Sequence, residues 1–309
     1  MKKLLFYRDF HGFTGGHLKV YDYFKHAKES GIFEASIHLT NSSLRDATNP
    51  WFANDEMISN EWDPQCSDAL FIAGLDWGAV PNNYDKPIIN LIQGIRHADP
   101  KDQRHAYLSR PATRICVSQE VADAIKSTGT ANGPVITIPN GLSTAGFPLP
   151  ARERDIEVLI SGYKQPELAS RLATRLEADG IQVKCLSKQL ARHDYLSLVA
   201  RAAVSIFLPL EKEGFYLPAL EGMVLETLVV CPDCVGNRGF CLHEKNCLQP
   251  LYHIDSIVLA CHDALTRILN GSSVEILAGG LRQARLHSLS EERRLFLEVL
   301  QTIASHHRI

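Results

Sequence analysis

The chain has 309 residues, of which 45% are hydrophobic and 22% are charged. These ordinary values exclude disordered and fibrous classes, and the length suits about two domains. Lys and Arg total 32 against 35 Asp and Glu, without the basic excess of a nucleic-acid-binding protein. No apolar run approaches the ~18 residues of a membrane span, and residues 4–7 are too short for a secretion signal. We therefore expect a cytoplasmic protein whose cysteines are reduced.

Short apolar runs alternate with amphipathic stretches, which predicts parallel sheets covered by helices. The polar stretch at residues 41–68 predicts a long irregular loop, and a helical stripe begins at Leu18. In the first half we expect strands at residues 3–7, 35–39, 69–73, 88–91, 114–117 and 135–138.

Residues 139–155 are rich in Gly and Pro, so regular structure should stop there. A final helix at 290–305 has Ser290 as its N-cap, with Glu291 and Glu292 in its first turn. Two similar halves around a short linker imply a cleft between domains, a common ligand site. In the second half we expect strands at 156–160, 182–186, 204–208 and 229–231, and helices at 167–178, 194–200, 218–225 and 255–269.

The most informative stretch is residues 204–221, whose pattern predicts a strand, a loop and the start of a helix. Pro218 suits a first helical turn. Glu213 falls in the loop and Glu221 in the opening turn of the helix, with seven residues between them. Both carboxylates can therefore face the space beyond the carboxyl end of the strand, where open α/β sheets bind ligands.

The residues around these carboxylates indicate a nucleotide pocket. Gly214 lets the backbone come close to a ligand, and the free N–H groups at the helix start suit a phosphate. A carboxylate beside them can accept two hydrogen bonds from a vicinal diol such as a ribose. The alternative is that Glu213 and Glu221 are solvated surface charges.

At this point the chain resembles a known family, the retaining GT-B glycosyltransferases often called glycosyl transferases group 1. The run EGFYLPALE at 213–221 matches their Glu, seven residues, Glu signature, and LVVCPDCVG at 228–236 follows as their Val-Val strand and Gly-rich loop do. IPNGL at 138–142 is similar to their interdomain segment, and VSQE at 117–120 to a strand end. Gly15 and Gly16 lie where the family has a glycine pair, before the first helix.

The resemblance implies the fold: α/β, GT-B, with two Rossmann-like domains whose parallel sheets face each other across a cleft. Residues 1–150 would form the N-terminal, acceptor-side domain and residues 151–288 the C-terminal, donor-binding domain. Residues 289–309 would form a C-terminal helix that crosses back to the N-terminal domain.

The resemblance also implies an activity, which is transfer of a sugar from a nucleotide-sugar donor to a glycan, lipid-linked or other hydroxyl acceptor with retained anomeric configuration. Glu221 would bind the donor ribose, and Glu213 would contact or position the transferred sugar. The helix start at Phe215, Tyr216 and Leu217 would bind the diphosphate, with Gly214 beside it. Gly15 and Gly16 would belong to the donor site.

Catalysis then requires stabilisation of the negative charge that grows on the leaving diphosphate. The sequence contains no Asp-x-Asp pair, so we expect neither a metal nor another cofactor. Lys164 is the candidate cation, although Tyr163 stands where the family has an arginine. His97, which follows a strand, would bond the donor sugar, and His17 is a second candidate. The family's reaction is described as front-face attack, with the departing phosphate deprotonating the acceptor.

Other interpretations stay open. The chain could bind a nucleotide or glycan, or serve as a partner subunit, without turnover, and a nucleotide-sugar epimerase is a third reading. Cys231, Cys234, Cys241, His243 and Cys247 have spacings that a zinc site could use, although buried thiols fit better. The glycines at 12–16 lack the spacing of a nicotinamide-binding loop. By analogy, such enzymes build surface polysaccharides, which leaves room for peripheral contact with the inner face of a membrane.

Overall fold

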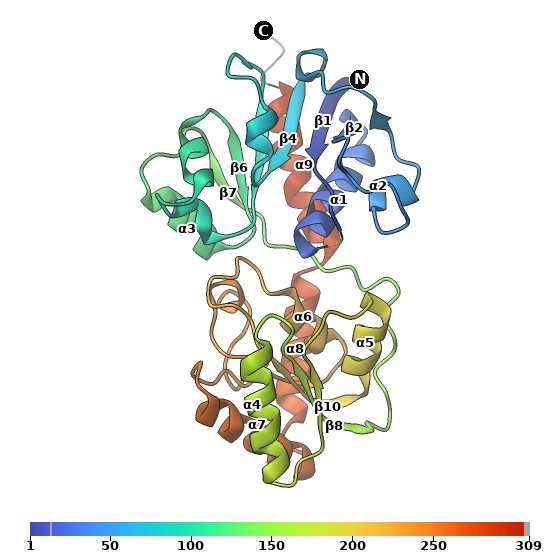
Figure 1. Ribbon diagram of the computed structural model, residues 1–309, viewed down its shortest axis with the longest axis vertical. Helices are drawn as coiled ribbons and strands as arrows, with labels where there is room; N and C mark the ends of the chain where they lie inside the picture. The colour runs from blue at the N-terminus through green and yellow to red at the C-terminus, as the bar shows by residue number, and fades with distance from the viewer. Residues whose placement is uncertain (13, 306–309) are drawn as a thin grey trace. The chain divides into compact units, whose positions relative to one another are not determined.

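The computed structural model describes residues 1–12 and 14–305 (Figure 1). Contacts divide the chain into two compact units, here called unit 1 (Met1–Asn140 with the C-terminal helix) and unit 2 (Gly141–Ser288). Each unit is built on a sheet of parallel strands, which confirms the predicted α/β class. Within the described ranges, no helix is both long enough and apolar enough to cross a membrane.

The sheet of unit 1 has the strand order β3-β2-β1-β4-β5-β6-β7. Strands β4 and β5 are buried along their whole length, which is why they read as continuous apolar runs. The strands are β1 (Lys2–Arg8), β2 (Phe33–Leu39), β3 (Ile58–Ser59), β4 (Ala69–Ala73), β5 (Ile88–Ile92), β6 (Thr113–Cys116) and β7 (Val135–Thr137). The helices are α1 (Gly15–Lys28), α2 (Pro50–Ala53), α3 (Gln119–Ser127) and α9 (Leu289–Ser305).

Helix α9 packs against α1 through an aromatic contact and a buried ionic cluster. The ring of Phe296 meets that of Tyr23 edge-on, with centroids 4.8 Å apart. Glu292 is buried and lies 2.6 Å from Lys19 Nζ and 3.1 Å from His26 Nε2. Lys19 and Glu292 thus neutralise each other's charge away from water.

The sheet of unit 2 has the order β11-β10-β8-β9 and apolar clusters on both faces. Helices α4 and α7 cover one face, and α5 and α6 cover the other. Helix α8 packs on α6. The strands are β8 (Ile156–Ser161), β9 (Val183–Leu186), β10 (Ala202–Phe207) and β11 (Leu228–Val230). The helices are α4 (Pro166–Ala178), α5 (Arg192–Arg201), α6 (Leu217–Val224), α7 (Ile254–Leu269) and α8 (Val274–Leu286).

The predicted strands are all present within about two residues of their expected bounds, but four details were wrong. The expected loop at 41–68 holds α2 and β3, because Asn49 caps a short helix whose Trp51 is fully buried. Helix α9 begins at Leu289, so Ser290 is its second residue and not its N-cap. Gly15 and Gly16 open α1 and do not precede it. Helix α8 was not predicted.

Candidate functional site

The candidate site of unit 2 lies where the strand order reverses. Strands β8 and β10 are neighbours in space, with Ser161 opposite Phe207 at their carboxyl ends. The chain leaves β8 toward β9 on one side and leaves β10 toward β11 on the other. The loops that follow β8 and β10 therefore open beside each other, which is the usual ligand position in an open parallel sheet.

The loop after β8 carries Lys164, whose ammonium forms an ion pair with Glu213 in the loop after β10. Nζ and Oε1 are 2.5 Å apart, and both side chains are mostly buried. The ammonium also lies 5.5 Å from the centre of the Tyr216 ring and 5.9 Å from that of Tyr163. The structure thus brings the predicted cation and the first predicted carboxylate into direct contact.

Helix α6 begins at Leu217 with Pro218 in its first turn, as predicted. Glu221 is its fifth residue, one place beyond the predicted opening turn. The N–H of Tyr216 donates to the Gly236 carbonyl, and Pro218 has no N–H to give. The start of this helix therefore offers a phosphate fewer donors than the sequence predicts.

Glu221 forms a second ion pair that the sequence analysis did not find. Its side chain is only 3% exposed, and Oε1 lies 2.7 Å from Nη1 of Arg192, the first residue of α5. Burial raises the pKa of the Glu221 carboxyl, and the charge of Arg192 acts against that rise. No sequence motif marks Arg192, because its partner lies 29 residues away.

Buried hydroxyl groups surround these two ion pairs. Tyr216 is 1% exposed and Ser161 is 2% exposed. The hydroxyl of Tyr216 has no hydrogen-bond partner among the described residues, whereas those of Ser161 and Tyr195 interact with each other. Burial, and then the charge of Glu221, raise the pKa of Tyr195. The Tyr216 hydroxyl, whose ring lies beside the Lys164 ammonium, can therefore bond a polar ligand.

The other predicted site residues belong to unit 1. His97 lies in a 3₁₀ turn, Ile95–Ala98, directly after β5, and is 5% exposed. Burial, with help from Arg104, lowers its pKa to about 3, so the imidazole is neutral at pH 7. Thr14 caps α1 through the N–H of His17, and burial lowers the pKa of His17 to about 4.

The Gly15–Gly16 pair lies at the same end of unit 1. Gln93, at the carboxyl end of β5, donates to the Gly16 carbonyl at 3.2 Å. A Cβ on Gly16 would meet the Gln93 amide at 3.4 Å, whereas one on Gly15 would meet nothing within 4 Å. An added Cβ would thus make only ordinary contacts at Gly16, so packing does not require a glycine at either position. The part of Gly16 in a donor site stays a prediction, as does that of His97.

The four cysteines with zinc-like spacings lie in the core of unit 2 and not around a metal-binding cavity. Cys231, Cys234, Cys241 and Cys247 are at most 3% exposed. Burial, and then the neighbouring thiols of Cys231 and Cys247, raise the pKa of Cys241. In residues 1–12 and 14–305, no three His, Cys, Asp or Glu side chains are arranged to hold a metal ion.

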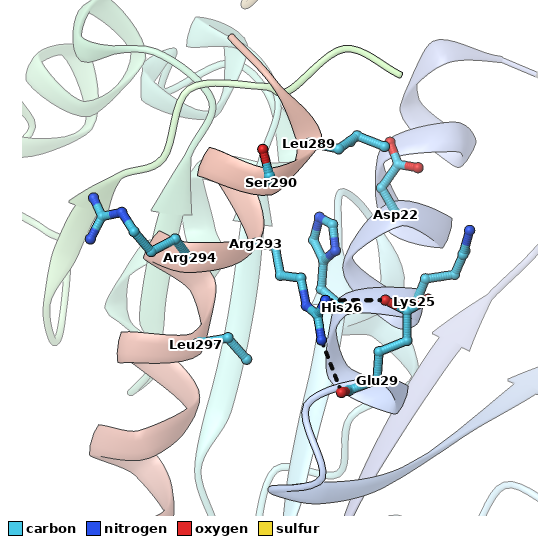
Figure 2. A pocket seen from close by; sticks show the side chains of 9 residues that line it. All are labelled: Asp22, Lys25, His26, Glu29, Leu289, Ser290, Arg293, Arg294 and Leu297. Atoms are coloured by element: carbon cyan, nitrogen blue, oxygen red, sulfur yellow. Dashed lines mark hydrogen bonds and ion pairs between the residues drawn. The ribbon is translucent and has the colours of Figure 1, made fainter. Parts of the chain in front are cut away.

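A pocket of about 420 Å³ lies in unit 1 between α1 and α9, and no predicted site residue lines it. Figure 2 shows Arg293 reaching across it to Glu29, which accepts a hydrogen bond through its carbonyl at 2.9 Å. Lys25 and Arg294 point outward from opposite walls. The pocket carries charges of both signs, without an arrangement that selects one ligand.

Solved structures resemble this chain along nearly its full length. A glycosyltransferase from Rickettsia africae superposes with a TM-score of 0.76 at 12% identity, covering 98% of both chains. HepE from Anabaena, solved in complex with UDP, gives 0.75 at 14% identity, covering 97% of this chain and 100% of its own. The lipopolysaccharide outer core galactosyltransferase WaaB gives 0.67 at 13% identity, covering 98% and 99%. The chain therefore has the GT-B fold predicted for it.

Comparisons by sequence do not assign the chain to a family. No protein-family model matches the chain. No curated protein matches it either.

Proposed function

We propose that this chain is a retaining, metal-independent glycosyltransferase that moves a sugar from a nucleoside-diphosphate sugar to a hydroxyl acceptor. One observation carries the proposal: Lys164 with Glu213, and Arg192 with Glu221, form two carboxylate–cation pairs where the strand order of unit 2 reverses. The likeness to GT-B structures supports it, and HepE, which has been solved with UDP-glucose, makes uridine nucleotides the first donors to test.

Each residue of the site then has a task. Glu221 accepts hydrogen bonds from the ribose hydroxyls, which a buried and ionised carboxylate does well. Lys164 neutralises the charge that develops on the leaving diphosphate, beside the start of α6 at Gly214, Phe215, Tyr216 and Leu217. Glu213 holds the ammonium in place and contacts the transferred sugar. The lysine charge fills the role that a metal ion has in other transferases.

The acceptor side belongs to unit 1. Because His97 is neutral at pH 7, it can donate one hydrogen bond and accept another at the donor sugar. Attack occurs on the face from which the diphosphate leaves, and the departing phosphate takes the acceptor proton, so no protein base is needed. A glycan or lipid-linked acceptor, reached at the inner face of a membrane from the cytoplasm, fits this scheme and polysaccharide biosynthesis.

The test is turnover with a panel of uridine, guanosine, adenosine and cytidine diphosphate sugars, measured as release of the nucleoside diphosphate. Glu213→Gln and Glu221→Gln should each lower kcat/KM by at least about 100-fold, the usual effect of losing one stabilising group. Glu211→Gln, an exposed residue of the same loop, is the matched control and should leave turnover unchanged. Proton NMR of the product then reads its anomeric configuration.

Other results would favour the alternatives. Tight binding of a nucleotide without turnover on any acceptor would indicate a binding or partner subunit. Tyr163, which stands where the family has an arginine, is the sequence feature that favours this alternative. Isomerisation of the donor without an acceptor would indicate an epimerase.

A further inference from the structure

Arg192 occupies a helix position where a cation is ordinarily unfavourable. It is the first residue of α5, at the positive end of the helix dipole, and Ala191 before it makes no side-chain cap. Asp194, also in the first turn, suits that end of the helix, and Arg192 does not. The reason for an arginine at this place must therefore lie in what its guanidinium contacts.

The guanidinium contacts a carboxylate that needs it. Glu221 is 3% exposed, and an ionised carboxylate at such a depth is costly unless a charge pairs with it. Burial and then the charge of Glu221 raise the pKa of Tyr195 on α5. Burial, and then Glu213 and Glu221 against Lys164, raise the pKa of Tyr163 after β8. Neither tyrosine supplies a positive charge. Arg192 is thus the group that favours the ionised form of Glu221.

Arg192 is itself held by an aromatic ring. Its guanidinium lies 5.5 Å from the centre of Phe147, which belongs to the Gly- and Pro-rich segment that precedes β8. A planar guanidinium stacks on such a ring and keeps its N–H groups free at the edge. The Arg192 side chain remains 39% exposed, so Phe147 orients it without burying it.

We propose that Arg192 is a positioning residue of the donor site: held on Phe147, it keeps Glu221 ionised and turned to accept the ribose hydroxyls. The inference rests on the proposed function, in which Glu221 binds the ribose. Only the carboxylate form accepts hydrogen bonds from both hydroxyls, because a protonated carboxyl gives up acceptor capacity. Arg192 therefore acts through Glu221, and its effect should appear as discrimination between ribose and 2′-deoxyribose.

The experiment compares binding of UDP, GDP, ADP and CDP with that of their 2′-deoxy forms, by titration calorimetry between pH 6 and 8. The nucleoside diphosphate that binds most tightly, with its 2′-deoxy form, is then used for every variant. In the unmodified protein, the ribonucleotide should bind more tightly than the deoxy form at every pH. In Arg192→Met, this preference should fall about tenfold, which corresponds to one lost hydrogen bond to a charged group. The preference should also fall more steeply toward acid pH than in the unmodified protein, because Glu221 takes up a proton more readily without Arg192.

Two further variants separate positioning from structure. Arg192→Lys keeps the charge and should restore most of the preference and its weaker dependence on pH. Arg201→Met is the matched control, since it removes an arginine of the same helix whose partner, Asp155, is exposed. Arg201→Met should leave both the ribose preference and its dependence on pH unchanged. Thermal melting by circular dichroism shows whether each variant is folded.

Three outcomes would overturn the proposal, and they are distinguishable. If Arg192→Met keeps the ribose preference at every pH, Arg192 does not act through Glu221. If it weakens the ribo and deoxy forms equally, Arg192 contacts another part of the nucleotide. If the unmodified protein binds no nucleoside diphosphate, the proposed function fails and the inference fails with it.

Discussion

Asp76 shows how burial sets the charge of a single side chain. It is 7% exposed and accepts hydrogen bonds at 2.8 Å from both the Arg8 guanidinium and the Ala73 N–H. Burial nevertheless raises its pKa to about 6, because the pairing with Arg8 only partly offsets the loss of water. Asp76 is a residue that no motif would single out.

We predict that the Asp76 carboxyl titrates near pH 6 in the folded protein, as followed by carbon-13 NMR. Since the pKa is 3.8 in the reference state and about 6 when folded, the folded protein binds the additional proton between these values. The contribution of Asp76 to the free energy of unfolding therefore decreases as the pH rises through this window. Arg8→Met should move the midpoint higher. A midpoint below 5 in the unmodified protein would contradict the prediction.

His97 should make the free energy of unfolding depend on pH in the opposite direction. Burial lowers its pKa from 6.5 to about 3, so the unfolded chain takes up a proton first as the pH falls. Acidification from pH 6.5 to 5 should then lower the free energy of unfolding by up to about 2 kcal/mol through this residue. Urea denaturation of the protein and of His97→Gln measures the difference. Leu108→Ala, which destabilises the core of unit 1 without removing an ionisable group, should keep the slope of the unmodified protein.

At the scale of elements, α9 is attached to unit 1 by charge as well as by apolar packing. Glu292→Gln leaves His26 and Lys19 with a weaker partner, although Lys19 keeps its ion pair with Asp22 at 2.8 Å, and we expect a loss of about 2 kcal/mol in the free energy of unfolding. Urea denaturation measures it. Glu298→Gln, which breaks an exposed pair with Arg294 on the same helix, should cause no measurable change. Equal losses in the two variants would mean that the buried cluster stabilises the protein no more than the exposed ion pair does.

Helix α8 shows why some elements escape prediction. Its two adjacent glycines, Gly279 and Gly280, count against a helix by propensity. In the structure Gly279 lies against the chain at Lys245, where an added Cβ would come within 1.9 Å of the carbonyl oxygen. The glycine is required by a neighbour distant in sequence, which a local pattern does not reveal.

Gly279→Ala should therefore destabilise the protein by about 2 kcal/mol, although alanine is the better helix former. Gly280→Ala provides the comparison, because its Cβ would meet the Met223 side chain at 3.1 Å and the Asn246 carbonyl oxygen only at 3.3 Å, against 1.9 Å for the backbone contact at Gly279. The melting temperature of Gly279→Ala should be well below that of Gly280→Ala. The reverse order would show that helix propensity outweighs the close approach.

For the whole molecule, the sequence was sufficient to predict two α/β units, because buried parallel strands leave apolar runs such as β4, β5 and β10. The run at 213–221 marked Glu213 and Glu221, which follow β10, and the family resemblance marked Lys164, which follows β8. It could not predict Arg192 or Phe147, whose contacts join segments far apart in the chain. Phe147 precedes β8, Arg192 opens α5 and Glu221 lies in α6, so only the folded chain brings the three together.

The most direct test of the account is to locate a bound nucleotide. Hydrogen–deuterium exchange should be measured with and without the nucleoside diphosphate that binds most tightly. The account predicts protection in the loops after β8 and β10, in α6, and in the first turn of α5. Protection confined to α1 and α9, around the pocket of Figure 2, would contradict it.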